Sequence, residues 1–210
     1  MTGRRPSVIG EHLGFLGRFL RNPRQVGAIA PSSRTLAREM VRGIPFTPAC
    51  HVVELGPGTG VFTREIIDAL PLGAKVLVID IDPTFCRRLK ERWMLLDCEC
   101  GSAADLPAFV AARGWAGVDH ILSGLPFASL PAALSRSILA AVQRSLRPGG
   151  TFTTFQYIHA YPTSPASKFR REMNSRFGPM TARRVVFRNL PPAFVLSWRQ
   201  PDRQDQRHST

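Results

Sequence analysis

A chain of 210 residues is long enough for one sizeable α/β domain and too short for two. No stretch approaches the roughly 20 apolar residues of a transmembrane helix, and the first 30 residues are too rich in Arg and Gly for a secretory signal, so composition argues against a membrane-spanning or secreted protein. The formal net charge of +13 divides into +6 for residues 1–50, 0 for residues 51–150 and +7 for residues 151–210, which favours a polyanionic partner, either a nucleic acid or an anionic bilayer.

Residues 1–30 predict an amphipathic helix and its lead-in. In the stretch VIGEHLGFLGRFLR the apolar side chains fall within an arc of about 160° on a helical wheel, and the arginines lie opposite. Three glycines lower the helicity of this stretch by roughly 1 kcal/mol each, so the helix needs a surface to fold against. The rest of the protein and a bilayer are both such surfaces, and the basic polar face favours a bilayer that contains anionic lipids.

Residues 31–200 predict one α/β domain, because apolar runs of strand length alternate with stretches of helical period. The expected strands are residues 50–56, 75–82, 96–100, 151–158, 182–190 and 193–200, together with residues 118–127, a strand that runs into a loop. The expected helices are residues 61–71, 83–93, 105–114 and 130–150, the last closed by two glycines. Five strand-and-helix steps and a final hairpin give a Rossmann-like, open, seven-stranded, mostly parallel sheet with helices on both faces and an antiparallel last strand. Residues 201–210 are expected to form a disordered tail.

The stretch ELGPGTG, residues 54–60, follows the first strand of this domain. In an open α/β sheet the ligand lies at the carboxyl ends of the strands beside the first turn, where glycines let it approach main-chain N–H groups. A dinucleotide site has the spacing G-x-G-x-x-G, whereas Gly56, Gly58 and Gly60 have the spacing G-x-G-x-G and follow Glu54. This form resembles motif I of the Rossmann-like S-adenosylmethionine-dependent methyltransferases.

That resemblance implies S-adenosyl-L-methionine as the cofactor and assigns its contacts. Glu54 meets the methionyl ammonium group through water, and Asp80 binds the ribose hydroxyls, with a helix cap as the alternative role for Asp80; Asp82 is expected to cap the next helix. The family often has an acid near the adenine after the third strand. Ser102 and Ala103 stand there instead, so a hydroxyl or main-chain contact is expected. The remaining expected cofactor contacts are Ile81 and Ser123.

The fourth strand runs into SGLPF, residues 123–127. In methyltransferases that act on the exocyclic amines of nucleobases, this loop begins with Asn or Asp, whose side chain and main-chain carbonyl accept the two N–H bonds of the planar amine. Gly124 stands at that position, while Leu125, Pro126 and Phe127 keep the rest of the loop. With Gly124 in place of Asn or Asp, the loop lacks the side-chain acceptor for one of the two N–H bonds of a base amine. The loop therefore disfavours nucleic acid as the substrate. It favours an aliphatic amine beside Gly124, Pro126 and Phe127.

An aliphatic amine has a pKa near 10.4, so only roughly one molecule in a thousand has a free lone pair at neutral pH. Burial against apolar walls lowers that pKa, and alignment with the methyl donor is then the main catalytic requirement. Tyr157 and Tyr161 follow the fifth strand and can accept a proton or place electron-rich faces around a cation. Tyr157 is therefore a catalytic candidate together with Gly124, and Tyr161 is a substrate-binding candidate together with Pro126 and Phe127. The alternative is that Tyr157 is an ordinary strand residue.

Over residues 22–199 the chain resembles the bacterial phospholipid N-methyltransferases, which convert phosphatidylethanolamine stepwise towards phosphatidylcholine. The more specific parts are GAIAPSSR at residues 27–34 and NLPP at residues 189–192. The resemblance implies phosphatidylethanolamine as the substrate, an amino-terminal helix that associates with the membrane, and a cytoplasmic protein held at the inner face of the cell membrane. Arg34 is then a candidate for the lipid phosphate, because a guanidinium offers two parallel donors; the alternatives are a surface charge or a partner at a helix start.

Two other functions stay open on the sequence. An rRNA adenine N6-dimethyltransferase would explain the fold, the basic charge and the LPF loop, but it predicts a side-chain acceptor at Gly124 and a separate RNA-binding domain. A non-catalytic, membrane-associated protein would bind the cofactor through Glu54, the glycines and Asp80 without transferring a methyl group.

The four cysteines bear on metal binding and redox state. No histidine stands at metal-ligand spacing beside them, and nothing in the composition indicates secretion. Reduced thiols and no metal are therefore expected.

Overall fold

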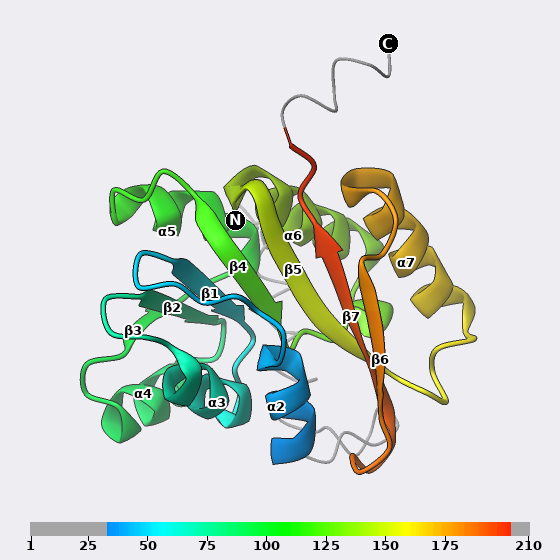
Figure 1. Cartoon of the computed structure of the whole chain (residues 1–210), viewed down its shortest axis with the longest axis horizontal. Helices are drawn as coiled ribbons and strands as arrows, with labels where there is room; N and C mark the ends of the chain where they lie inside the picture. The colour runs from blue at the N-terminus through cyan, green and yellow to red at the C-terminus, as the bar shows by residue number, and fades with distance from the viewer. Residues whose placement is uncertain (1–32, 203–210) are drawn as a thin grey trace, which may run out of the picture.

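The computed structural model describes residues 33–202, so the expectations for residues 1–30 and for the tail from residue 203 lie outside the described residues. The elements in chain order are α2 (Arg34–Val41), β1 (His51–Leu55), α3 (Val61–Ala69), β2 (Lys75–Asp80), α4 (Pro83–Arg92), β3 (Asp97–Cys100), η2 (Ala103–Asp105), α5 (Leu106–Ala112), β4 (Val118–Ser123), η3 (Phe127–Ser129), α6 (Ala132–Ser145), β5 (Leu146–Tyr157), α7 (Ser164–Phe177), β6 (Ala182–Val186) and β7 (Ala193–Arg199). Figure 1 shows them arranged as one sheet with helices on either side.

The strands form one seven-stranded sheet in the order β3-β2-β1-β4-β5-β7-β6. β1 to β5 pair in parallel, and β7 is antiparallel to both β5 and β6. The central strands are continuous apolar runs because helices cover both faces; in β1, Val52, Val53 and Leu55 are all fully buried. The expected Rossmann-like sheet with its antiparallel last strand is confirmed.

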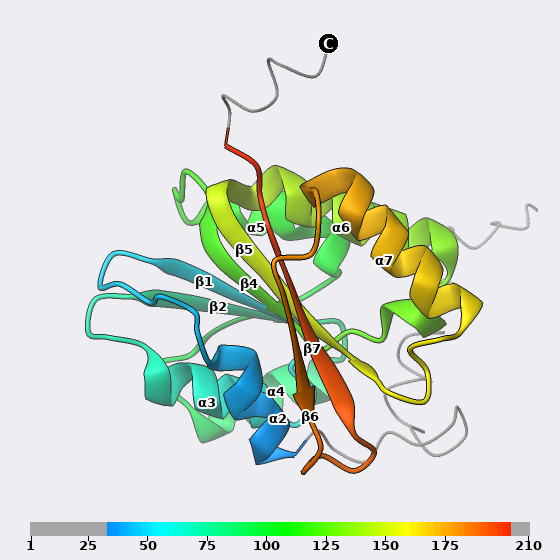
Figure 2. The ribbon, with the colours of Figure 1, turned by 45° about the vertical axis from the view of Figure 1, so that its right-hand side comes forward.

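The helices divide between the two faces of the sheet (Figure 2). One core cluster joins the sheet to α5, α6 and α7 through residues such as Val110, Ile138 and Phe169. On the other face, α2 and α3 pack through residues such as Leu36 and Ile66, with α4 beside them in a smaller cluster. The carboxyl ends of the parallel strands therefore emerge between two helical layers, which is where an open α/β sheet binds its ligand.

The end of α6 differs from the sequence expectation. The helix ends at Ser145, and Gly149 and Gly150 lie within β5, which begins at Leu146. The register between β4 and β5 shifts at this point, and an ideal Cβ at Gly150 would lie 2.9 Å from the carbonyl oxygen of Arg147. The two glycines therefore mark an irregularity in the strand rather than a helix stop.

The sequence predicts no helix over α7, and at α2 it offers a helix start at Arg34 only as an alternative, yet both helices form. In α7 the buried side chains recur every three or four residues, as on one face of a helix; they are Ala166, Phe169, Met173 and Phe177. The α2 helix begins after Ser33, whose hydroxyl accepts a hydrogen bond from the Leu36 amide at 3.2 Å and so caps the helix.

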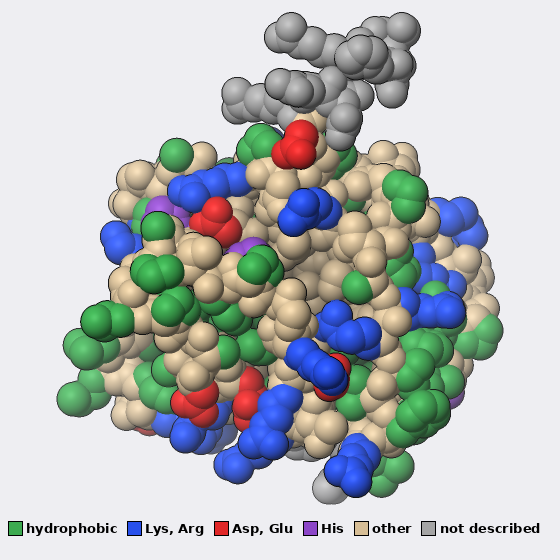
Figure 3. Space-filling view, in the orientation of Figure 1, with side chains coloured by type: hydrophobic (Ala, Val, Ile, Leu, Met, Phe, Trp, Pro, Cys, Tyr) green, Lys and Arg blue, Asp and Glu red, His purple; other side chains and the backbone are tan. Residues whose placement is uncertain are grey.

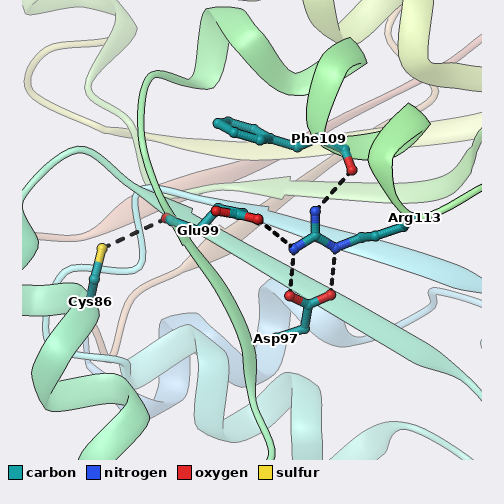
Figure 4. Close-up of polar contacts among 5 residues, drawn as sticks. All are labelled: Cys86, Asp97, Glu99, Phe109 and Arg113. Atoms are coloured by element: carbon teal, nitrogen blue, oxygen red, sulfur yellow. Dashed lines mark hydrogen bonds and ion pairs between the residues drawn. The ribbon is translucent and has the colours of Figure 1, made fainter.

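Arg113 fixes the outer strand β3 to α5 (Figure 4). Its guanidinium donates two hydrogen bonds to Asp97, both at 2.5 Å, one to Glu99 at 2.9 Å and one to the carbonyl of Phe109 at 2.9 Å. The bonds to Asp97, followed by the bond to Glu99, raise the pKa of Arg113. This clamp holds the strand that leads into residues 101–103, where the adenine contact is expected.

The part of the chain between residues 33 and 202 has no helix that is long and apolar enough to cross a bilayer. The cysteines are free thiols; Cys50, Cys86 and Cys98 are buried and Cys100 is exposed. Among the described residues, no group of three His, Cys, Asp or Glu side chains is placed so that it could hold a metal ion.

Candidate functional site

Most of the expected cofactor residues meet at the carboxyl edge of the sheet. Leu55 at the end of β1 pairs with Ile79 on β2 and with Ser123 on β4. Main-chain bonds continue this alignment into the loops: the Gly56 amide donates to the carbonyl of Ile79 at 2.9 Å, and the Gly124 amide donates to that of Leu55 at 2.8 Å. The loops after β1, β2 and β4 are therefore held side by side.

The turn after β1 needs all three glycines because each has a positive φ, and two of them also pack against other side chains. Gly56, Gly58 and Gly60 have φ values of 69°, 54° and 81°, a left-handed conformation that favours glycine. An added Cβ at Gly56 would lie 2.5 Å from Leu125, and one at Gly60 would lie 2.7 Å from Leu89, whereas one at Gly58 would meet nothing within 4 Å. Gly56 and Gly60 thus allow close packing, and Gly58 presents bare main chain to open space.

Glu54 is a fully buried carboxylate at the end of β1. Its Oε2 accepts a hydrogen bond from the Thr63 hydroxyl at 2.6 Å, and its Oε1 has no hydrogen-bond partner within residues 33–202. Burial raises the pKa of Glu54 to about 8, although the bond from Thr63 acts in the opposite direction. Thr63 is not predicted from the sequence as a site residue, because its signal there is a hydroxyl on the apolar face of α3.

Asp80 is buried at the end of β2 and is held by the main chain. Its Oδ2 accepts a hydrogen bond from the Gly58 amide at 3.1 Å, and its Oδ1 accepts one from the Asp82 amide at 2.9 Å. Burial raises the pKa of Asp80, and these two bonds oppose that shift. Asp82 caps α4 by accepting a hydrogen bond from the Thr84 amide at 2.8 Å, so the cap predicted for Asp82 is confirmed.

The remaining expected cofactor residues lie around the same edge. The Ser102 hydroxyl caps η2 by accepting a bond from the Ala104 amide at 3.2 Å, and Ala103 beside it is buried. Ile81 is half-buried against the cluster that includes α5 to α7. The Ser123 hydroxyl accepts a bond from the Leu125 amide at 3.2 Å, so it shapes the SGLPF loop.

Gly124 is packed against the glycine turn. An ideal Cβ at this position would lie 2.6 Å from the carbonyl oxygen of Gly56 and 3.4 Å from the ring of Phe62. A side chain therefore cannot be placed at residue 124 without moving the main chain of the turn after β1. The glycine that replaces an amide in this loop is required by the packing of this protein.

Phe127 packs mainly into the core. Its ring stacks on Phe169, with centroids 4.8 Å apart, and meets Phe152 edge-on at 6.1 Å. Its outer side lines an open groove of about 670 Å³ between η3, α6 and α7. Apolar side chains and three cations line this groove; they include Leu130, Phe169, Arg136, Lys168 and Arg171. Pro126, the residue before Phe127, is half-buried in the same loop.

The structure does not bring Tyr157 and Tyr161 together. Tyr157 ends β5 and is buried on the α2 and α3 face, with its ring stacked on that of His159 at 5.7 Å. Tyr161 lies on the opposite side, where the guanidinium of Arg170 covers its ring at 3.7 Å and Arg183 donates to its hydroxyl at 3.4 Å. Arg34, the first residue of α2, is exposed.

The chain is similar to known methyltransferases. Residues 52–150 match the family described as a methyltransferase domain. The chain is 36% identical to the ornithine lipid N-methyltransferase of Singulisphaera acidiphila over 182 residues, which cover 85% of this chain and 91% of that protein. It is 31% identical to the ribosomal RNA small subunit methyltransferase A of Kineococcus radiotolerans over 106 residues, which cover 49% of this chain and 29% of that protein.

A solved structure supports the same fold. The 1,6-didemethyltoxoflavin-N1-methyltransferase of Burkholderia thailandensis, with bound 1,6-didemethyltoxoflavin and S-adenosylhomocysteine, superposes with a TM-score of 0.66. The match has 16% sequence identity and covers 96% of this chain and 94% of that chain. At this identity the likeness concerns the fold.

Proposed function

The chain belongs to the class I S-adenosylmethionine-dependent methyltransferases, and we propose that it transfers the methyl group of S-adenosylmethionine to the primary amine of a membrane lipid. S-adenosylmethionine is the cofactor of this family. The lipid substrate is supported by the relative from Singulisphaera acidiphila, which is named for N-methylation of a lipid and aligns over 91% of its own length.

The residues at the carboxyl edge fit this cofactor, which when bound supplies a methyl group on a positively charged sulfur. The Oε1 atom of Glu54 is buried and has no partner within the described part of the chain, so the ammonium group of a bound cofactor, reached through water, would satisfy it and favour its ionised form. Each oxygen of Asp80 already accepts one main-chain bond and keeps a further lone pair for a ribose hydroxyl. Gly58 leaves its main chain open to the ligand.

The observation that carries the substrate class is the contact between Gly124 and Gly56. Since no side chain fits at residue 124, the loop offers a main-chain carbonyl but no side-chain amide to a planar base amine. An aliphatic amine does not need the second acceptor. It needs an apolar surrounding that lowers its pKa and a position in line with the methyl donor.

The groove beside Phe127 supports an amphiphilic substrate. It is lined by apolar side chains and by the cations Arg136, Lys168 and Arg171, a combination that matches a lipid with an anionic group. Glu172 also lines the groove, but it is paired with Arg176 at 2.6 Å. The groove begins at the loop that holds the amine, so acyl chains lying there would leave the head group at the carboxyl edge.

From the sequence resemblance we propose phosphatidylethanolamine as the substrate, whose amine would be methylated stepwise to give the mono- and dimethylated lipids and then phosphatidylcholine. Ornithine lipid, the substrate in the name of the relative, is the second candidate. Both have a primary amine a few bonds from an anion, a phosphate in one and a carboxylate in the other. With a lipid as substrate, we propose that the protein associates peripherally with the inner face of the cell membrane.

Tyr157 is the proposed proton acceptor, because it ends the strand next to β4 and lies near the same edge. Replacing its hydroxyl in Tyr157→Phe keeps the packed ring. We expect a lower turnover rate with unchanged cofactor affinity, and an unchanged rate would remove Tyr157 from the catalytic residues.

The match to a ribosomal RNA methyltransferase keeps RNA as the alternative substrate, and a cofactor-binding protein without catalysis is the second alternative.

The test incubates the purified protein with labelled S-adenosylmethionine in three separate reactions. These contain vesicles of phosphatidylethanolamine, vesicles containing ornithine lipid, or structured RNA. Mass spectrometry of the lipid products then locates the added methyl group on the head-group nitrogen. Label in RNA alone, or in none of the three, contradicts the proposal.

A further inference from the structure

The turn between β6 and β7, residues 187–192, carries two large apolar side chains that point into solvent. Phe187 is 76% exposed and Leu190 is 83% exposed. Arg188 lies between them and is also exposed. At the bottom of Figure 3, hydrophobic and basic side chains lie next to each other where Figure 1 places this turn.

Hydrogen bonds to α2 and to the segment around it anchor the turn on its inner side. Asn189 is 2% exposed; its Oδ1 accepts two hydrogen bonds from Ser33 and its Nδ2 donates to the carbonyl of Pro191. Arg184 of β6 donates to the carbonyls of Glu39 and Arg42 in the α2 region. Because the buried polar groups of the turn face inward, Phe187 and Leu190 are presented outward by a fixed scaffold.

This turn lies at the same edge of the sheet as the cofactor site. Ala193 pairs with both Val186 and Tyr157, the last residues of β6 and β5, so the turn projects beyond the carboxyl ends of the strands. Arg34, next to Ser33, and Arg188, next to Asn189, flank the contact between α2 and the turn. Within residues 33–202, neither guanidinium forms an ion pair with an acidic side chain.

We propose that residues 187–190 form a membrane-docking tip, in which Phe187 and Leu190 enter the interfacial region of an anionic bilayer while Arg188 contacts lipid phosphates. Apolar side chains flanked by cations match the interface of an anionic membrane. Two side chains on one turn offer much less than the roughly 800 Å² per partner of a stable protein interface, so a protein partner fits less well. The proposal rests on the proposed function, since docking at this edge would bring the methyl donor to the lipid head groups.

The test uses the full chain and vesicles of phosphatidylcholine mixed with phosphatidylglycerol. We expect the double variant Phe187→Ser/Leu190→Ser to bind them at least about 10-fold more weakly than the unmodified protein. Leu72→Ser/Leu95→Ser is the matched control, because these leucines are 98% and 100% exposed in the loops that precede β2 and β3, at the opposite edge. The control should bind within about twofold of the unmodified protein. Equal binding by both double variants would overturn the proposal.

Thermal unfolding and S-adenosylhomocysteine binding show whether the double variant folds. If it does not fold, tryptophan fluorescence at residue 187 reports membrane contact directly. In Phe187→Trp the emission should shift to the blue when vesicles are added and should be quenched by brominated acyl chains, whereas Leu72→Trp should do neither. Emission from Phe187→Trp that is already blue-shifted in buffer and unchanged by vesicles would show that another part of the chain covers the tip, and would refute membrane docking.

The rate of lipid methylation distinguishes a failure of the docking proposal from a failure of the proposed function. Amine lipid is offered in detergent micelles and in vesicles, and the double variant should lose activity on vesicles while keeping it on micelles. If lipid is methylated in both forms but vesicle binding does not depend on the tip, the docking proposal fails alone. If vesicle binding depends on the tip but no lipid is methylated in either form, the proposed function fails alone.

Discussion

The hydroxyl of Ser33 donates a hydrogen bond to Oδ1 of Asn189 at 2.7 Å, across 156 positions of the sequence. The Ser33 amide donates to the same oxygen at 3.0 Å, and the Ser33 hydroxyl also caps α2 by accepting from Leu36. GAIAPSSR and NLPP, the two stretches that carry the lipid-methyltransferase resemblance, are thus joined by one buried amide. This contact fixes the start of α2 at the carboxyl edge.

Replacing Asn189 should therefore destabilise the protein. In Asn189→Ala the two donors of Ser33 lose their acceptor, and a loss of about 1–3 kcal/mol in the free energy of unfolding is expected from denaturant titration. Arg188→Ala is the control; this neighbouring side chain is exposed, and a change within about 0.5 kcal/mol is expected. Equal effects of the two substitutions would mean that the Ser33–Asn189 contact does not stabilise α2.

Gly124 should not tolerate even a methyl group. In Gly124→Ala the new Cβ would lie 2.6 Å from the Gly56 carbonyl oxygen, so either the SGLPF loop or the glycine turn must move. We expect a loss of about 1–3 kcal/mol in stability and a weaker affinity for S-adenosylhomocysteine, measured by denaturant titration and calorimetry. Gly114→Ala has positive φ but open space around its Cβ, so only the cost in stability should appear there. Unchanged ligand affinity in Gly124→Ala would contradict the coupling of the two loops.

Asp80 should be required for cofactor binding and Asp82 should not. Asp80→Asn removes the charge and leaves one acceptor oxygen where the ribose hydroxyls are proposed to bind, so the affinity for S-adenosylhomocysteine should fall by about tenfold or more, corresponding to roughly 1.4 kcal/mol or more. Asp82→Asn keeps a good helix cap and should leave the affinity unchanged. A similar affinity in both variants would exclude Asp80 from the binding site.

Glu54 should make stability depend on pH. Its pKa is raised from 4.5 to about 8 in the folded protein, so between these values the folded state holds a proton that the unfolded chain has released. The stability contributed by the protonated group is complete below the unfolded pKa and is lost as pH rises through the folded pKa. Relative to Glu54→Gln, the unmodified protein should lose on the order of 5 kcal/mol between about pH 4 and pH 9, measured by denaturant titration. Parallel pH profiles would contradict the raised pKa.

The same carboxylate links protonation to cofactor binding. A bound ammonium group favours the ionised form of Glu54, so S-adenosylhomocysteine binding at pH 7 should release a proton from the unmodified protein. Calorimetry in two buffers with different ionisation enthalpies measures that release. Glu54→Gln should release less, and identical release from both proteins would remove Glu54 from contact with the ammonium.

Sequence patterns predicted the sheet because its strands are buried on both faces and therefore read as apolar runs, as in Val52 to Leu55 and Leu77 to Asp80. The cap at Asp82 was predictable because its signal, an acid followed by Pro83 at a helix start, is local. Helix α7 has an equally local signal in the spacing of its buried residues, so it is predictable from the sequence too.

Features that depend on contacts between distant segments could not be predicted. The requirement for glycine at residue 124 comes from Gly56, which belongs to a different loop, and the raised pKa of Glu54 comes from burial under α3. The separation of Tyr157 and Tyr161 arises because the chain crosses from one face of the sheet to the other within four residues after β5. The spacing of residues along the sequence does not show any of these three-dimensional contacts.

The most direct test of the account is a competition in one vessel. The purified protein receives labelled S-adenosylmethionine together with vesicles that contain an amine lipid and with structured RNA, and the label in each is counted after separation. We predict label on the lipid amine, dependent on Asp80 and absent from RNA. Label in RNA with none in lipid would contradict the central claim that Gly124 and the loop around it select an aliphatic amine.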